Sequence, residues 1–348
     1  MSSREDRIYV SLVSVPEAFF STLSGLYDVL NSLEMIGSFD DAVPAKNPFH
    51  VRIVGQDRGL VDTASGLPFK AHRSIEETKH ADIVIVPALF VANGEWTRGR
   101  HPEVVKWLLK MHDQGAVMCS TCSGGLLLAE TGLLDGKDAT THWAYHETFR
   151  KNYPEVNLRL ENVLVTAGSR EQLVMAGASA SWHDLALYLI ARHIGPRAAQ
   201  ATAKFMSIQW HRDGQAPYLI FDPPLGHGDA SILSAQEWLS ENYSVAAPVE
   251  EVVKRSELPE RSFKRRFTKA TGYSPIAYIQ CLRVEAAKRQ LETSDAPIEE
   301  ISWTVGYEDQ AFFRRLFKRI THVTPGAYRR KFRVPEIAFH GDQSQIVH

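Results

Sequence analysis

Apolar residues follow one pattern in the first two hundred positions of the chain and a different one in the last hundred. In the first part, short runs rich in Val and Ile alternate with stretches of helical period. The expected strands are 8-IYVSLV, 50-HVRIVG, 82-DIVIVP, 116-AVMCS and 162-NVLVTAG. An expected helix, 102-PEVVKWLLKMHDQG, begins with proline and ends with glycine, as helices prefer. Apolar strands that alternate with helices predict an α/β fold with a doubly wound, mostly parallel sheet of flavodoxin-like type.

The last hundred residues show helical periods only, and one pattern occurs there twice, at 248–279 and at 297–329. Each copy has a short helix, a tight turn and a second helix with paired arginines between phenylalanines. Ser-Pro or Thr-Pro and a tyrosine then close the copy. Helices are expected at about 231–242, 248–255, 260–270, 275–293, 298–304, 309–320 and 325–332. Two short helices joined by a turn, the second rich in Arg and Lys, are typical of a helix-turn-helix. We therefore expect an all-α domain with two helix-turn-helix units that bind double-stranded DNA.

The charge distribution supports this interpretation independently. Between positions 246 and 333 there are 18 Lys and Arg against 11 Asp and Glu, whereas the whole chain has a net charge of −2. The remainder is therefore acidic, and the positive charge is concentrated in the helical domain. Such a concentration is expected of a domain that neutralises DNA phosphates.

The pattern also places the domain boundaries. Residues 213–230 are rich in Pro, Gly and Asp and show little periodicity, which predicts a linker. The expected organisation is an α/β domain at 1–212, this linker, a double helix-turn-helix domain at 231–333 and a flexible tail at 334–348.

Composition narrows the class of protein further. Apolar residues make up 44% of the chain, yet no segment has the roughly twenty apolar residues that a membrane span needs. Three cysteines cannot form a disulfide framework, and the start of the chain lacks the layout of a signal peptide. We expect a cytoplasmic location. No His and Cys cluster has zinc-finger spacing and no glycine-rich phosphate loop occurs, so neither a metal site nor a cofactor is expected.

A cysteine is expected on a sharp turn at the end of the fourth predicted strand. In 118-MCSTCSGG, Cys122 would stand at the start of a helix, where backbone N–H groups favour a thiolate. Gly124 and Gly125 permit the tight turn that places nucleophiles in elbow-type hydrolases. Cys119 and Cys122 also form C-x-x-C, so redox sensing stays an alternative, although Cys119 falls in the strand.

Two longer motifs resemble known families. The segment 122-CSGGLLLAETGLLDGKDATTHW resembles the signature of PfpI-type domains in the class I glutamine-amidotransferase-like superfamily. The second helical copy, with Gly306-Tyr307, Phe313, Phe317, Thr324-Pro325 and Tyr328-Arg329, resembles the AraC/XylS family of transcriptional regulators. Together the two resemblances cover about residues 8–210 and 230–332. They imply a regulator that dimerises through its first domain and responds to an amino acid or a quaternary amine.

Two departures from the PfpI pattern argue against catalysis. Catalytic relatives pair the elbow cysteine with an acidic residue that follows the first strand, but Thr22 aligns at that position and Glu17 lies five residues earlier. Ser123 stands where many active relatives have histidine. We therefore expect a binding domain and no catalytic residues, with Cys122 as the nucleophile if the domain is an enzyme. The predicted pocket is formed by Cys122, Ser123, His142, Trp143, Thr22, Ser179 and Trp182. Core packing is an equal alternative for the two tryptophans.

The second helix of each unit supplies the predicted DNA contacts. By position in the AraC-type motif they are Arg261, Ser262, Lys264, Arg265, Gln310, Ala311, Phe312, Arg315 and Lys318. Arg and Lys suit guanine, Gln suits adenine, and Phe312 can touch a thymine methyl group. The repeated phenylalanines 263, 267, 313 and 317 are expected in the core. Arg266, Arg314, Lys318, Arg329 and Arg330 suit either phosphate contact or plain solvation.

The sequence thus predicts a sequence-specific DNA-binding transcriptional regulator whose first domain senses a small metabolite without catalysis. Three alternatives stay open. The first is a Cys122-dependent amidase, hydratase or protease joined to a DNA-binding domain, and the second is a redox sensor. The third is an architectural DNA binder with a vestigial first domain.

Overall fold

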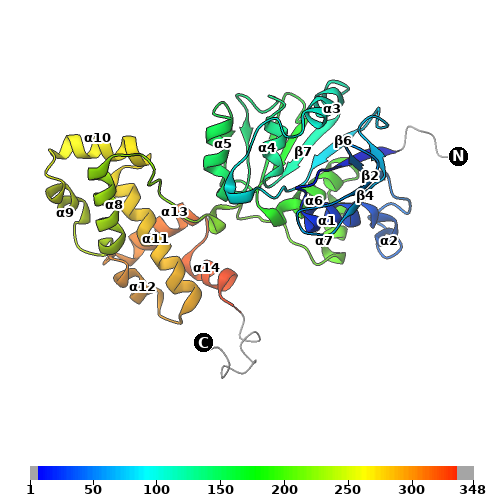
Figure 1. Cartoon of the computed structure of the whole chain (residues 1–348). Helices are drawn as coiled ribbons and strands as arrows, with labels where there is room; N and C mark the ends of the chain where they lie inside the picture. The colour runs from blue at the N-terminus through cyan, green and yellow to red at the C-terminus, as the bar shows by residue number, and fades with distance from the viewer. Residues whose placement is uncertain (1–6, 335–348) are drawn as a thin grey trace, which may run out of the picture. The chain divides into compact units, whose positions relative to one another are not determined.

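The computed structural model describes residues 7–334, which form two compact units that divide between Gln215 and Ala216. The first unit is α/β and the second is helical (Figure 1). Apart from Val334, the predicted tail at 334–348 lies outside the described residues. No helix in the described part of the chain is long and apolar enough to cross a membrane.

A seven-stranded sheet forms the centre of the first unit within the described residues, in the order β10-β11-β7-β6-β1-β2-β5. All neighbouring strands run parallel except β10 and β11, which are antiparallel. The strands are β1 Ile8–Ser14, β2 Phe49–Gly55, β5 Arg73–Ser74, β6 Ile83–Val86, β7 Val117–Thr121, β10 Leu164–Ala167 and β11 Leu173–Ala176. Two small pairs lie outside the sheet: β3 Gly59–Val61 with β4 Phe69–Ala71, and β8 Asp138–Ala139 with β9 Asn157–Leu158.

Helices cover both faces of this sheet, as a doubly wound fold requires. In Figure 1, α3, α4 and α5 lie on one side of strands β6 and β7, and α1, α6 and α7 lie on the other. The helices of this unit are α1 Phe20–Asn31, α2 Leu33–Gly37, α3 Pro102–Asp113, α4 Gly124–Ala129, α5 His146–Asn152, α6 Trp182–His193 and α7 Pro196–Phe205. One continuous apolar core runs from β1 to α7.

The predicted fold class is confirmed, and all five predicted strands are present. The pattern missed β11, since its four residues run directly into the small residues of 176-AGASAS without a break in polarity. The strand order also defines where a ligand would bind. The chain passes from β1 to β2 on one side and then returns to β6 on the other, so the carboxyl ends of β1 and β6 flank the topological switch point.

Seven helices make up the second unit between Ala230 and Phe332, each within about a residue of its prediction. They are α8 Ala230–Asn242, α9 Pro248–Arg255, α10 Glu260–Thr271, α11 Pro275–Thr293, α12 Ile298–Thr304, α13 Gln310–Thr321 and α14 Pro325–Phe332. Local signals set their starts, because Asp229, Ser274, Asp309 and Thr324 each accept a hydrogen bond from a backbone N–H of the first turn.

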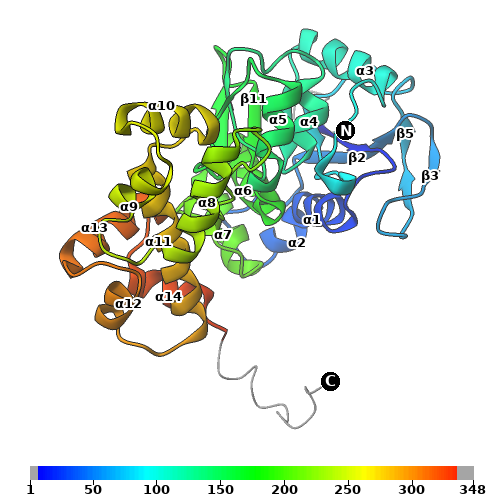
Figure 2. The same ribbon diagram turned by 60° about the vertical axis from the view of Figure 1, so that its left-hand side comes forward.

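The long helix α11 contributes to two apolar cores, one for each helix-turn-helix (Figure 2). Its first half supplies Tyr278 and Ile279 to the core formed with α8, α9 and α10. Its second half supplies Val284, Ala287 and Leu291 to the core formed with α12, α13 and α14. The two helix-turn-helix motifs therefore share α11 as one rigid connector.

The segment predicted as a linker is irregular, but hydrogen bonds hold its two ends, one to the first unit and the other to the second. Gln215 is buried in the first unit, where its Nε2 donates to the carbonyl oxygen of Asn162 at 2.8 Å. In the second unit, the buried Lys288 donates to the Leu219 carbonyl oxygen at 2.6 Å. Asp229, at the end of the segment, accepts hydrogen bonds from Nε and Nη2 of Arg266.

A buried arginine fixes the turn of the second helix-turn-helix. Arg283 of α11 donates to the carbonyl oxygens of Tyr243, Gly306 and Val245 at 2.7, 2.8 and 3.1 Å. Its guanidinium carbon also lies 4.7 Å from the centre of the Tyr307 ring. Gly306 has φ +92°, and a Cβ there would lie 2.6 Å from the Ser244 carbonyl oxygen. Both the backbone conformation and the close packing therefore require glycine.

Gly306→Val should unfold the second helix-turn-helix rather than alter its specificity. A β-branched residue at this φ and this contact should lower the free energy of unfolding by at least about 3 kcal/mol. Circular dichroism during urea unfolding would measure the change. Gly326→Ala is a suitable control, because the nearest atoms to a new Cβ there are 3.7 Å away and its φ is ordinary. A valine variant with the helix content and melting of the wild type would contradict the assignment.

Candidate functional sites

Helices α10 and α13 occupy equivalent places in the two helix-turn-helix units. Phe263 and Phe267 of α10 correspond to Phe313 and Phe317 of α13, and all four are fully buried, as predicted. Each second phenylalanine meets a tyrosine edge to face, Phe267 with Tyr278 at 5.1 Å and Phe317 with Tyr328 at 5.5 Å. These contacts fix which face of each helix points outward.

The outward face carries the predicted DNA contacts. Seven of these side chains are exposed and the other two, Ser262 and Gln310, are half-buried; the exposed ones are Arg261, Lys264, Arg265, Ala311, Phe312, Arg315 and Lys318. Arg265 and Arg315 are equivalent, each standing two residues after the first buried phenylalanine. Neither forms a salt bridge with another residue in the described part of the chain. Their guanidinium groups are thus available for an external partner.

Other arginines of the motif have internal partners. Arg266 pairs with Asp229, Arg314 pairs with Glu299, and Arg329 donates to the Ala296 carbonyl oxygen at 2.6 Å. In this structure they stabilise the helical domain, and solvation is not their only role. Phe312 is only 37% exposed and packs at 5.6 Å against the Tyr307 ring, so it combines an exposed edge with a structural contact.

In the first unit, Cys122 forms the sharp elbow that the sequence predicts. It follows β7 directly and has φ +52°, a conformation that is strained for a residue with a side chain. Its N–H donates to the Ala176 carbonyl oxygen at 2.8 Å, and its own carbonyl accepts from the Thr141 hydroxyl at 2.9 Å. A Cβ at Gly124 would lie 2.2 Å from the Pro87 carbonyl oxygen, so glycine allows α4 to start there.

The expected thiolate character of Cys122 is wrong for this environment. The side chain is 2% exposed, and burial raises the pKa of the thiol, although hydrogen bonds from Ser179 and Ser123 oppose the rise. Sγ lies 3.3 Å from the Ser179 hydroxyl oxygen. The short helix that begins after Cys122 does not offset the loss of solvation.

No carboxylate is within hydrogen-bonding distance of Cys122 among the described residues. Thr22, which the sequence pattern aligns with the acidic position, is buried in α1. The Glu17 carboxylate pairs instead with Arg100 and His101, and the hydrogen bond from His101 holds the pKa of Glu17 below its usual value. The pairing of the elbow cysteine with a carboxylate is therefore not assembled among the described residues.

The predicted pocket residues divide into two groups. Ser123 is fully buried; its hydroxyl accepts from the N–H of Leu89 and donates to the Leu89 carbonyl. Ser123 thereby holds the elbow, and Thr22 is buried within α1. Trp182 packs so closely on Gly25 that a Cβ there would lie 2.6 Å from its ring. These three side chains have internal roles in this structure.

The second group lies around the elbow. Besides Cys122 and Ser179, it contains His142 and Trp143, whose ring centres are 5.2 Å apart. Burial lowers the pKa of His142, so its imidazole is neutral near pH 7. Sequence reasoning missed Tyr145, whose ring centre is 6.0 Å from that of His142. Its place two residues after the Thr-Thr-His-Trp motif is the signal that could have identified it.

A cavity that the sequence did not indicate lies beyond the carboxyl ends of β1 and β2. It has a volume of about 450 Å³ and is lined by Ser14, Val15, Pro16, Gln56, Asp57, Leu60, Val61, Asp62 and His101. Ser14 is 1% exposed, and its hydroxyl has no hydrogen-bond partner among the described residues. Two carboxylates and a buried hydroxyl without a partner suit a ligand with a positive charge and a hydrogen-bonding group.

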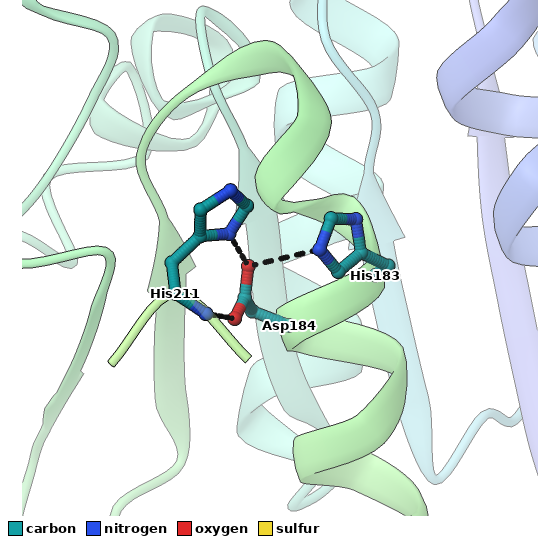
Figure 3. Close-up of side chains that lie close together, drawn as sticks. All are labelled: His183, Asp184 and His211. Carbon is teal, nitrogen blue, oxygen red and sulfur yellow. Dashed lines mark hydrogen bonds and ion pairs between the residues drawn. The ribbon is translucent and has the colours of Figure 1, made fainter. Parts of the chain in front are cut away.

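The structure also brings together three residues that could hold a metal ion. His183, Asp184 and His211 bring three ligand atoms within 4.8 Å of one another (Figure 3). Two of these residues are adjacent in sequence, whereas the third comes from a segment 27 positions later. Spacing along the chain could not reveal this group.

Comparison with known proteins agrees with both halves of the structure. The model of the DJ-1/PfpI family matches residues 24–177, and that of a helix-turn-helix domain matches residues 252–331. The HTH-type transcriptional regulator CdhR of Pseudomonas aeruginosa is 27% identical over 291 residues, which cover 81% of this chain and 84% of CdhR. Isonitrile hydratase of Pseudomonas putida is 29% identical over 140 residues, 40% of this chain and 54% of the hydratase.

A solved structure of an AraC family transcriptional regulator from Pseudomonas putida is also similar. It covers 57% of this chain and 99% of its own chain, with a TM-score of 0.48 and 16% identity.

Arg265→Ala and Arg315→Ala should each weaken binding to a specific DNA site by about 1–3 kcal/mol, since each would remove a bidentate contact to a base. The site would first be selected from a random DNA library, and affinities would then be measured by fluorescence anisotropy on that site and on scrambled DNA. Arg289→Ala removes one exposed positive charge from α11 and serves as the control. Equal losses on specific and scrambled DNA would show that the two arginines contact only phosphate.

The cysteines of the native protein should react slowly with a thiol reagent such as DTNB at about pH 8, because only thiolates react and burial keeps these groups protonated. Burial raises the pKa of Cys281 to about 11 and also raises the pKa of Cys119 and Cys122. All three should react rapidly in urea. Rapid labelling that disappears in Cys122→Ser would reveal an activated Cys122 and revive the redox alternative.

Proposed function

Since this chain joins a DJ-1/PfpI-type domain to a helix-turn-helix domain of the AraC type, we propose that it is a sequence-specific transcriptional regulator controlled by a small-molecule effector. One observation supports the DNA-binding part of this proposal most directly. The two helix-turn-helix units present Arg265 and Arg315 at equivalent, exposed and unpaired positions. Similarity to CdhR over most of both chains supports the same function.

The shared helix α11 explains how the two helix-turn-helix motifs can bind one DNA site together. Because both cores include α11, the outward faces of α10 and α13 are held at a fixed separation. Two such helices can enter successive segments of the major groove on one face of DNA, about 34 Å apart. We further propose that the regulator acts as a homodimer on repeated half-sites in the cytoplasm.

The first unit is proposed to bind its effector without turning it over. The support is chemical: Cys122 is protonated and buried, no described carboxylate pairs with it, and the Ser123 hydroxyl is committed to Leu89. These features remove the base and the exposed nucleophile that acyl transfer needs. The strained elbow then serves to fix the floor of a binding site.

The effector class that fits this unit is a small cation, such as an amino acid or a quaternary amine. Asp57 and Asp62 in the cavity beyond β1 and β2 supply negative charge. The aromatic group of His142, Trp143 and Tyr145 near the elbow supplies ring faces that attract such cations. Binding at either place would shift the population that is competent on DNA.

A thermal-shift screen of the purified protein against amino acids, betaines, carnitine-like amines and polyamines tests this proposal. A true effector should raise the melting temperature by several degrees and change the affinity for the selected DNA site. Asp62→Asn should weaken the response if the cation lies in the cavity, and Trp143→Leu if it lies near the elbow. Asp41→Asn, an exposed acid elsewhere in the unit, is the control. Stabilisation without any change in DNA affinity would contradict effector control.

An enzymatic role is a second candidate, favoured by the positive φ of Cys122 and by the similarity to isonitrile hydratase over 140 residues. Turnover of isonitriles or amides that disappears in Cys122→Ala would establish it. Effector binding that survives in that variant, without turnover in either protein, would favour the sensor.

A further inference from the structure

The side chains of His183, Asp184 and His211 converge on one point at the start of α6. The Asp184 Oδ2 atom lies 2.6 Å from Nδ1 of His211 and 3.6 Å from Nε2 of His183. The two imidazole rings stack with their centres 5.0 Å apart and an angle of 30° between them. Figure 3 shows the two rings on opposite sides of the carboxylate. The function proposed above uses none of these residues.

The carboxylate at the centre of this group lacks a permanent cation. Asp184 is 1% exposed, and no Lys or Arg among the described residues forms a salt bridge with it. It accepts hydrogen bonds from the backbone N–H and Nδ1 of His211 at 2.9 and 2.6 Å. A buried carboxylate is expensive unless a positive charge compensates it.

The donor set suits a zinc ion. Two imidazoles and one carboxylate are the ligands that Zn²⁺ takes in sites with three protein ligands, and they disfavour Ca²⁺ and Mg²⁺, which prefer oxygen. Bonds of about 2.0–2.2 Å in a tetrahedron would separate ligand atoms by about 3.3 Å. The two separations at Asp184 Oδ2, 2.6 and 3.6 Å, lie on either side of that value. Small rotations of the rings would therefore complete the geometry.

Metal binding would replace two hydrogen bonds. The Nδ1 proton of His211 would leave, and the ring would carry its proton on Nε2 instead. His183 would give up the hydrogen bond from Nε2 to the Gln209 carbonyl oxygen, now 3.0 Å, and its ring proton would move from Nε2 to Nδ1. The ion would supply a positive charge beside the buried Asp184 carboxylate.

We propose that His183, Asp184 and His211 bind one Zn²⁺ and that this ion fixes the last segment of the first unit to α6. His211 belongs to the irregular stretch between α7 and Gln215, which the buried amide of Gln215 also anchors. The second unit follows this stretch directly in the sequence. Zinc would therefore act where the chain leaves the first unit.

The test uses the full-length protein, stripped with EDTA, equilibrated with micromolar Zn²⁺ and passed through a desalting column. Mass spectrometry of the metal content should give about one Zn²⁺ per chain for the wild type and about none for His183→Gln. His80→Gln is the matched control, since His80 belongs to another His–Asp pair, 3.2 Å from Asp82, which is exposed and has no third ligand. It should retain the ion.

Two further readouts separate ligation from folding. Without metal, the His183→Gln variant should melt close to the wild type, because a glutamine amide can also donate to the Gln209 carbonyl oxygen that His183 now contacts. Zinc should raise the melting temperature of the wild type alone and slow tryptic cleavage after the exposed Arg212. A wild type that retains no zinc, or a His183→Gln variant that retains as much, would overturn the proposal. Affinity for DNA, measured without metal, tests the proposed regulator independently.

Discussion

The buried guanidinium of Arg283 is the contact on which the helical unit depends. From the middle of α11 it donates to three backbone carbonyls, two in the loop after α8 and one in the turn between α12 and α13. A planar group with five donors suits this task, and no other side chain offers that geometry. Through Arg283, the connector helix, the first core and the second turn are fixed relative to one another. The spacing between α10 and α13, which carry the predicted DNA contacts, therefore follows from interior packing.

The two helix-turn-helix units reach similar geometry with different turn residues. The first turn has Glu257 with φ +53° and the second has Gly306 with φ +92°. After α10 and α13, which are the second helices of the two motifs, the turns are more alike. Thr271 and Thr321 each donate to the carbonyl four residues earlier and accept from the N–H two residues later. The chain then turns through Gly272 or His322, both with positive φ, into a helix capped by Ser274 or Thr324.

The first unit places a buried thiol on a strained turn. The strained Cys122 persists because its N–H donates to Ala176 and its carbonyl accepts from the Thr141 hydroxyl. The glycine after Ser123 allows α4 to pack against Pro87. Desolvation then decides the state of the thiol, since no neighbouring charge stabilises a thiolate. The sharp turn fixes where the Cys122 side chain lies, whereas the reactivity of its thiol depends on the groups that surround it.

The sequence by itself determined the local and repeated features of this protein. Strand and helix patterns, capping residues and the duplicated motif identified both domains, the buried phenylalanines and the outward arginines, because these depend on periods of two and 3.6 residues. Only the tertiary structure decided which charged groups are engaged: Arg266 with Asp229, Glu17 with His101, and His211 with Asp184. It also decided that Cys122 is protonated and that a cavity lies beyond β1 and β2. The physical reason is that burial and charge pairing arise between segments far apart in the chain, where local sequence patterns carry no information about distance.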